Sequence, residues 1–165
     1  MRKILVIGSC GAGKSTLAKE LSKKLNLPLI VLDQLYWNKN WERTPRDVWR
    51  KKVEELVKGD SWVIDGNHQN TFDLRFPVCD TVILLDINRF VCFWRIWKRR
   101  MLKNRVDQLD NCEEKIDFNF MKWVLWDYPG RGRKEIVQFI EKYNEKNIIV
   151  INSNKQINNI DSIIA

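Results

Sequence analysis

The sequence has 165 residues, 44% of them hydrophobic, and this length fits one domain, expected over residues 1–165, with a core that needs no disulfides. No apolar run approaches the roughly 18 residues of a membrane span, and residues 1–3 lead into a strand rather than a signal peptide. We therefore expect a cytoplasmic protein without a membrane anchor. The net charge of +8 excludes neither phosphate-handling enzymes nor nucleic-acid binders, because both bind anions.

A glycine-rich motif follows the first predicted strand. The apolar run 4–7 predicts that strand, and the pattern G-x-x-x-x-G-K-S occupies residues 8–15 directly after it. The glycines let backbone N–H groups converge on phosphate oxygens, Lys14 reaches the terminal phosphates, and the Ser15 hydroxyl is placed to ligate Mg²⁺. The helix that starts here directs its positive dipole end at the anion. We expect ATP at Gly8, Ser9, Cys10, Gly11, Ala12, Gly13, Lys14, Ser15 and Thr16.

The next elements alternate between helix and strand. Leucines at helical spacing predict that the first helix ends near Asn26. Residues 29–32 predict a second buried strand that delivers Asp33 at its carboxyl end, where ligands bind in open α/β sheets. Thr44, followed by proline, predicts the start of another helix, with Thr44 as its cap.

Two further strands each end in an aspartate. Residues 61–65 and 81–86 predict the third and fourth strands, with Asp65 and Asp86 at their ends. Asn88 can cap the next helix. The apolar stripe of that helix consists of Phe90, Trp94, Trp97 and Met101.

The C-terminal third is harder to assign. Residues 116–126 predict a helix, and we consider residues 106–132 as a lid-like insertion. Gly130 and Gly132 are expected to separate this stretch from the next helix. The remaining elements expected are a helix over 133–143, a strand over 148–151 and a helix over 157–164. Strands that alternate with helices predict a mostly parallel sheet covered on both faces.

Two carboxylates are candidates to orient Mg²⁺. Asp86 follows the longer apolar run, whereas Asp65 is followed by Gly66, which lets the backbone approach a ligand. Either acid can instead cap the turn or helix that follows it. Because no Asn-Lys-x-Asp motif for guanine is present, the sequence favours a kinase over a GTPase.

The helix from Asn88 onward is rich in arginine and lysine and has no acid. Arg95 and Arg99 lie four residues apart and so on one face. Phosphoryl transfer depends on positioning and charge stabilisation, so arginines aimed at the γ-phosphate suit a kinase. The alternative is a solvated basic face. Arg131 and Arg133 either close over the phosphates or cap a helix.

The acceptor side is predicted from fewer signals. Asp33 is the best candidate to contact an acceptor, as ligand or general base. Tyr36, Trp37 and Trp41 either wall the acceptor pocket or belong to the core. His68, the only histidine, is interpreted as a surface-loop residue near the cleft rather than a catalytic one.

Several of these motifs together resemble a family. Residues 8–15, Asp33, the sequence Trp62-Val63-Ile64-Asp65-Gly66-Asn67, and Asp73-Leu74-Arg75 are similar to the adenylate-kinase-related proteins labelled topology modulation, or FlaR-related. Residues 82–86 followed by Arg95 and Arg99 extend the similarity over most of the chain, to about residue 105. The loop motif is common to all P-loop proteins, and the combination is more specific.

The resemblance implies a three-layer P-loop fold like that of nucleoside monophosphate kinases, with the five-stranded parallel sheet in the order 2-3-1-4-5. It favours Asp65 over Asp86 at the metal, because those kinases carry Asp-Gly-Phe-Pro-Arg there. In this chain residues 67–69 are Asn-His-Gln, and Arg75 is the nearest downstream arginine. Arg75 is therefore our candidate for the acceptor.

Two hypotheses follow. The first is a kinase that uses ATP and Mg²⁺ and phosphorylates a small acceptor, such as a nucleoside or nucleotide, held by Asp33, Trp37, Asp65 and Arg75. Lys14, Arg95, Arg99 and Asp33 would be its catalytic residues. The second is a nucleic-acid-associated protein in which ATP is a switch, using the basic helix and exposed tryptophans.

Overall fold

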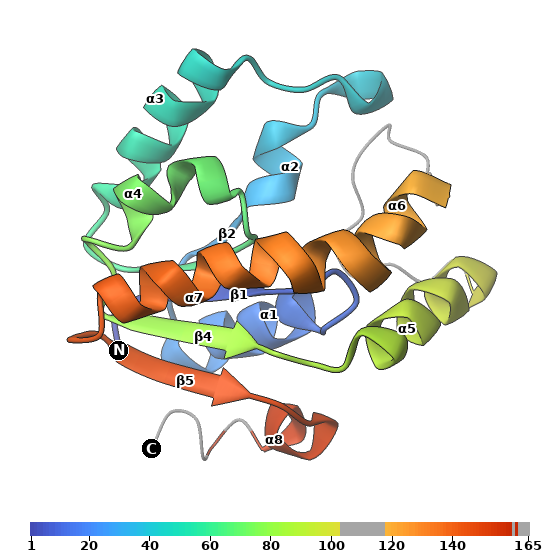
Figure 1. The fold of residues 1–165 in the computed structure, drawn as a ribbon. Coiled ribbons are helices and arrows are strands. Elements are labelled where there is room, and N and C mark those ends of the chain that lie inside the picture. The colour runs from blue at the N-terminus through green and yellow to red at the C-terminus, as the bar shows by residue number, and fades with distance from the viewer. Residues whose placement is uncertain (103–117, 160, 162–165) are drawn as a thin grey trace.

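The computed structural model describes residues 1–102, 118–159 and 161. Its centre is a five-stranded parallel sheet in the order β2-β3-β1-β4-β5 (Figure 1). The order expected from the sequence is confirmed. Helices connect successive strands because parallel neighbours cannot be joined by a tight turn. The strands are β1 (Lys3–Gly8), β2 (Leu29–Val31), β3 (Trp62–Asp65), β4 (Thr81–Leu85) and β5 (Asn147–Ile151).

The helices vary widely in length. The α-helices are α1 (Lys14–Leu25), α2 (Leu32–Tyr36), α3 (Arg46–Val57), α4 (Phe72–Arg75), α5 (Arg89–Leu102), α6 (Phe118–Lys122), α7 (Arg133–Lys142) and α8 (Asn154–Asn158). Short 3₁₀ turns lie at η1 (Lys39–Trp41) and η2 (Gln69–Thr71), and a π-helical segment, η3 (Trp123–Gly132), lies between α6 and α7. In the described part of the chain, none of these helices has the length and apolarity to cross a bilayer.

The sheet separates two apolar cores, because successive side chains of a strand point to opposite faces. Ile4 and Val6 of β1 pack in one core, with residues of α1, α5 and α8. Leu5 and Ile7 pack in the other, with residues of α2, α3, α4 and α7. The segment η3 contributes to both, through Val124 and Tyr128 respectively.

The second strand differs from its prediction. It ends at Val31, and it forms an edge of the sheet, so its first residue, Leu29, is 37% exposed rather than buried. The chain turns directly into α2, which places Asp33 in the first turn of that helix and not at the strand end. The expected end of α1 is confirmed, since Asn26 takes the left-handed conformation (φ 52°) that closes a helix.

Thr44 does not cap the helix that follows it, and that prediction was wrong. Its Oγ1 donates a hydrogen bond to the Tyr36 carbonyl oxygen at 2.6 Å, and its backbone N donates to the same oxygen at 3.1 Å. Thr44 therefore ties the loop back to the end of α2. The N-cap of α3 is Pro45.

The apolar stripe of α5 is not its buried face. The apolar stripe faces outward, with exposed fractions of 62% for Phe90, 54% for Trp94, 52% for Trp97 and 67% for Met101. The helix packs instead through Cys92 and Ile96, which are buried under the loop after β1. Asn88 does cap the helix, since its Oδ1 accepts a hydrogen bond from the N–H of Phe90 at 2.9 Å.

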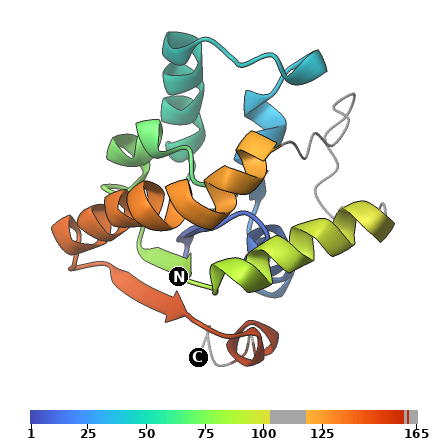
Figure 2. The ribbon, with the colours of Figure 1, turned by 45° about the vertical axis from the view of Figure 1, so that its right-hand side comes forward.

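The segments α6, η3 and α7 form one continuous helical rod across the molecule (Figure 2). Val124, Tyr128, Gly132 and Ile136 recur every four residues along it, and all are buried. Gly130 and Gly132 were expected to separate two helices. They do not, because this buried stripe holds one continuous helical rod on the sheet. Of the stretch considered as a lid, residues 118–132 belong to the rod, and residues 106–117 lie outside the described residues.

The two glycines of the rod should respond oppositely to alanine. A Cβ on Gly132 would lie 2.9 Å from the Tyr128 ring, so Gly132→Ala should lower the free energy of unfolding by about 1–3 kcal/mol through overpacking. Nothing lies within 4 Å of a Cβ on Gly130, so Gly130→Ala should raise it by about 0.5–1 kcal/mol. Urea unfolding measures both, and equal effects of the two changes would contradict this packing.

Candidate active site

The glycine-rich loop begins at the carboxyl end of β1. Gly8, Gly11 and Gly13 have φ angles of 146°, 76° and 103°, which a side chain rarely tolerates. Close packing imposes a second constraint: a Cβ on Gly8 would lie 2.5 Å from the Leu85 carbonyl oxygen, and one on Gly11 would lie 2.5 Å from that of Cys92. The loop is thus wedged between β4 and α5.

The loop leads into α1, whose N-cap is Gly13. Lys14 curls back over it, and its Nζ donates a hydrogen bond to the Ser9 carbonyl oxygen at 2.9 Å. Ser15 is half-buried and Thr16 is exposed, so both lie within reach of the surface at the helix N-terminus. The N-terminus of a 12-residue helix behind a loop of this form suits an anion.

Arg95 lies behind the loop rather than in front of it. Its Nη1 donates hydrogen bonds to the carbonyl oxygens of Ala12 at 2.9 Å and Gly11 at 3.3 Å. In a trans peptide the carbonyl and the following N–H point in opposite directions. By holding these carbonyls, Arg95 turns the N–H groups of Ala12 and Gly13 away from α5. Arg99 lies one turn further along α5, half-buried, with its Nε buried.

The two candidate metal carboxylates have different surroundings. Asp65 is the last residue of β3 and is almost fully buried beside β1, where it pairs in register with Val6. Asp86 follows β4 and binds Arg133 through two contacts, Oδ1 to Nε at 2.8 Å and Oδ2 to Nη2 at 2.7 Å. Hydrogen bonding to Asp86 raises the pKa of Arg133. Arg131 and Arg133 are both exposed.

A small cavity lies beside the loop, at the carboxyl end of β4. Its volume is about 190 Å³. Ser9 contributes the wall from the glycine-rich loop, and the Asp86–Arg133 pair contributes another. Its lining residues are Ser9, Asp86, Ile87, Asn88, Arg89, Tyr128, Pro129 and Arg133.

Asp33 meets His68 on the other side of the loop. The distance from Asp33 Oδ1 to His68 Nε2 is 2.9 Å. The imidazole also contacts the rings of Tyr36 and Trp49, at centroid distances of 4.6 and 5.0 Å. The side chain of His68 is only 12% exposed and that of Asp33 is 45% exposed. His68 is therefore not the surface-loop residue that the sequence suggested. Asp33 is the more exposed residue of the pair.

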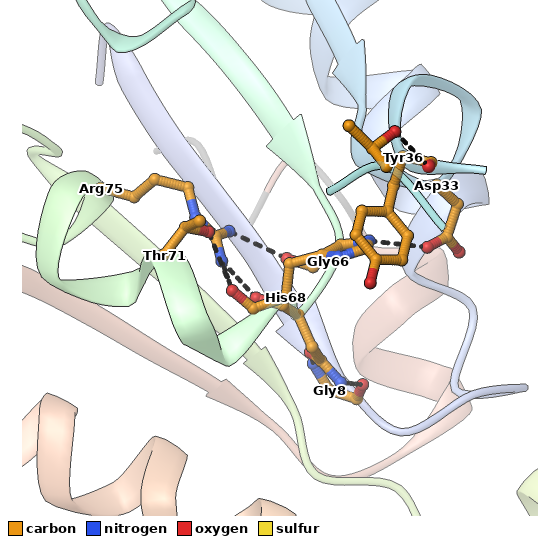
Figure 3. Close-up of polar contacts among 9 residues, drawn as sticks. Gly8, Asp33, Tyr36, Gly66, His68, Thr71 and Arg75 are labelled. Carbon is orange, nitrogen blue, oxygen red and sulfur yellow. Dashed lines mark hydrogen bonds and ion pairs between the residues drawn. The ribbon is translucent and has the colours of Figure 1, made fainter. Parts of the chain in front are cut away.

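Trp37 and Arg75, the other acceptor candidates, lie in unlike environments. Trp37 is half-buried at the end of α2, with its ring edge-on to Tyr36 and Trp41. Arg75 is fully buried, and its guanidinium donates hydrogen bonds to the backbone carbonyls of residues 66–68 (Figure 3). This differs from the expected contact with an acceptor, because a guanidinium enclosed in this way presents no donor to one.

Sequence reasoning gave Asn67 no role, yet it contacts the start of the loop. Its Oδ1 accepts a hydrogen bond from the Gly8 N–H at 2.9 Å, and its Nδ2 donates to the Gly8 carbonyl oxygen at 2.8 Å. A signal was present in the sequence. Residue 67 follows β3, which is adjacent to β1 in the predicted order, and the carboxyl ends of neighbouring parallel strands meet at one edge.

Comparison with known families assigns the chain to one of them. Residues 4–116 match the family model described as AAA domain, which is more than half of the chain. The chain belongs to this AAA domain family. The match begins at β1 and includes the glycine-rich loop, both candidate metal carboxylates and α5.

Two curated relatives are each 28% identical to the chain. One is a tRNA dimethylallyltransferase from Mycoplasmoides gallisepticum, aligned over 165 residues that cover 88% of this chain and 54% of that protein. The other is a shikimate kinase from Sulfurihydrogenibium sp., aligned over 104 residues that cover 53% of this chain and 62% of that protein. The chain thus spans between half and two thirds of the length of these relatives.

Solved structures resemble the whole chain. The shikimate kinase from Bacteroides thetaiotaomicron matches with a TM-score of 0.56 and 21% identity, covering 98% of this chain and 94% of that one. The shikimate kinase from Acinetobacter baumannii in complex with shikimate matches with a TM-score of 0.64 and 16% identity, covering 99% and 93%. At these identities the likeness concerns the fold, and it confirms the kinase-like P-loop architecture.

The contact between Arg95 and the loop can be tested by its effect on stability. Arg95→Ala removes a charged donor from two carbonyls and should lower the free energy of unfolding by about 2 kcal/mol. Lys98, on the same helix, is exposed and stacks over the Trp94 ring, so Lys98→Ala should cost only about 0.5 kcal/mol. Chemical denaturation of both variants measures the difference. A loss no greater for Arg95→Ala than for Lys98→Ala would contradict the contact.

Proposed function

We propose that the chain is an ATP-dependent phosphotransferase that moves the γ-phosphoryl group of MgATP to a small acceptor, such as a nucleoside or nucleotide. The observation that carries the proposal is the arrangement of two half-sites around one loop. The glycines of a complete phosphate-binding motif adopt left-handed angles at the end of β1, and the Asp33–His68 pair lies on the β2 side of that loop. The similarity to shikimate kinases supports a small-molecule acceptor.

On the nucleotide side, each residue has a role that its position supports. Loop amides after Gly8, whose own N–H is bonded to Asn67, would donate to phosphate oxygens. Lys14 would exchange the Ser9 carbonyl for a terminal phosphate. Ser15 and Asp65 would hold Mg²⁺, since Asp86 is occupied by Arg133. When bound, MgATP supplies the phosphoryl group and an ion that offsets its charge.

Arg95 and Arg99 complete this side. Arg95 keeps the loop amides directed inward through its bonds to the Gly11 and Ala12 carbonyls. Arg99, on the same face of α5, would approach the transferred group. A guanidinium suits that place because its planar fork holds two oxygens at once.

On the acceptor side, Asp33 is placed to bind an acceptor hydroxyl and receive its proton as the hydroxyl attacks. His68 orients the carboxylate through its contact with Oδ1 at 2.9 Å. The half-buried ring of Trp37 would border the acceptor. Membership of the topology modulation group and a cytoplasmic location are narrower proposals that rest on the sequence motifs and composition.

A transfer assay tests the proposal. ATP consumption is measured with panels of nucleosides, nucleotides and small hydroxyl metabolites, and we expect turnover with at least one class. Lys14→Ala should reduce that turnover by at least about 100-fold, because it removes a charge aimed at the developing phosphate charge. Lys19→Ala, on the exposed side of α1, is the matched control and should keep the wild-type rate. Circular dichroism checks that both variants fold. Undiminished turnover in Lys14→Ala would refute the assignment.

The outward stripe of α5 favours a second function, binding of single-stranded nucleic acid switched by ATP. The stripe, Phe90, Trp94, Trp97 and Met101, lies opposite the loop-facing residues Cys92 and Ile96. Cations flank its rings: Lys98 Nζ lies 5.0 Å from the Trp94 centroid, and the Arg89 guanidinium lies 5.1 Å from that of Phe90. Exposed aromatic rings among cations stack bases and bind phosphates.

Fluorescence anisotropy with a labelled oligonucleotide tests this second function. The double variant Trp94→Ala and Trp97→Ala should weaken binding at least about tenfold, because each stacked base contributes to affinity. Trp126→Ala is the control, since Trp126 is equally exposed but lies on η3. Affinity should also fall steeply with salt. Failure of the wild-type protein to bind at low salt, or equal binding by the double variant, would exclude this function.

A further inference from the structure

Arg75 is a buried cation whose hydrogen-bond partners are a hydroxyl and backbone carbonyls. Its Nη1 donates to the Gly66 carbonyl oxygen at 3.0 Å, and its Nη2 donates to the carbonyl oxygens of Asn67 and, at 3.0 Å, His68. Its Nε donates to Thr71 Oγ1 at 3.2 Å. Burial lowers its pKa to about 9, which leaves the guanidinium charged at neutral pH.

The segment that Arg75 holds is irregular, and of its three carbonyls that of His68 also accepts hydrogen bonds from the Thr71 N–H at 2.9 Å and Oγ1 at 2.8 Å. The backbone leaves the sheet at Gly66, whose φ is 130°, and turns again at His68, whose φ is 34°. The Gly66 N–H still donates to the Val6 carbonyl oxygen of β1 at 3.2 Å. Buried carbonyls without donors are costly. The fork of one guanidinium supplies several donors in a fixed geometry, which a lysine does not. Arg75 therefore fixes the path of residues 66–68.

The side chains of this segment leave it in two directions (Figure 3). Asn67 pairs with both backbone groups of Gly8, at 2.9 and 2.8 Å, and so continues the contact between β3 and β1. His68 reaches the other way and contacts Asp33 at 2.9 Å. One clamped segment thus contacts the first peptide of the phosphate-binding loop and the carboxylate of the acceptor side.

We propose that Arg75 is a positioning residue that sets the nucleotide loop and the Asp33 carboxylate relative to each other, acting through Asn67 and His68. The inference rests on the proposed function in taking Gly8 and Asp33 as parts of the two half-sites. It assigns Arg75 no contact with either substrate. Arg75, Asn67 and His68 then act as one unit, in which the loss of Arg75 disturbs both ends and the loss of Asn67 disturbs one.

The chain offers a unique probe at each end of this unit. His68 is its only histidine, so the imidazole C–H signal in an NMR spectrum belongs to it alone. With seven glycines, a ¹⁵N-glycine-labelled sample gives a spectrum in which the Gly8 amide can be followed. Gly59, in the turn after α3, serves as an internal reference. Neither probe requires phosphoryl transfer, so a failure of the proposed function leaves this test intact.

Arg75→Gln should displace both the Gly8 amide signal and the His68 ring signal, and should weaken binding of a fluorescent ATP analogue about tenfold, because the Gly8 peptide loses its fixed partner. Arg75→Lys should restore these properties only in part. Asn67→Ala should displace the Gly8 signal and leave that of His68 in place. Lys146→Gln is the control: Lys146 donates to the Pro77 carbonyl oxygen at 3.0 Å, beyond the C-terminal end of α4, and its loss should move neither signal.

A folded Arg75→Gln protein with both signals at their wild-type positions overturns the proposal, and so does one in which only one of the two signals moves. If Arg75→Gln does not fold, Asn67→Ala decides, because it removes only the contacts to Gly8 and keeps the backbone that Arg75 holds. An unchanged Gly8 signal in Asn67→Ala also overturns the proposal. A general loss of stability would not move both signals in Arg75→Gln and only the Gly8 signal in Asn67→Ala.

Discussion

The candidate site depends on how little room there is around Gly8. On one side the Leu85 carbonyl oxygen lies where a Cβ would have to be, and on the other the Asn67 side chain bonds both backbone groups of the peptide. The first residue of the phosphate loop is therefore fixed by the ends of both neighbouring strands. The parallel topology makes this possible, because it brings the carboxyl ends of β3, β1 and β4 to one edge of the sheet.

The cations around the loop differ in the groups that they bind. Lys14, Arg95 and Arg75 each donate to backbone carbonyls, and the cation that binds a carboxylate at this edge of β4 is Arg133, through Asp86. Cations held by carbonyls keep most of their charge available to an anion nearby, whereas an ion pair is largely neutral. The Asp86–Arg133 pair therefore contributes little net field at this edge.

Patterns with a local physical cause were predicted correctly from the sequence. The loop and the caps at Asn26 and Asn88 follow from short motifs and were found as expected. The strand order, also found, was implied by the family resemblance and not by local patterns. The buried face of α5 was not predictable in this way, because periodicity identifies an apolar stripe but not the side from which the loop approaches. Cys92 and Ile96 are buried because Gly11 packs directly against them. The roles assigned to Arg75 and His68 failed for a related reason, since both depend on partners that meet only after the sheet has formed.

The identity of the atoms that Arg75 binds has a consequence for the conditions under which the framework holds. Carbonyl oxygens do not titrate, so mild acid cannot remove the partners of this cation, and their enclosure limits screening by salt. The other two links at this edge, Asp33 with His68 and Asp86 with Arg133, involve carboxylates that are 45% and 24% exposed, so salt can screen them. The geometry of residues 66–68, which join the two half-sites, is therefore the least sensitive to solution conditions. The contacts made by Asp33 and Asp86 are the more sensitive ones.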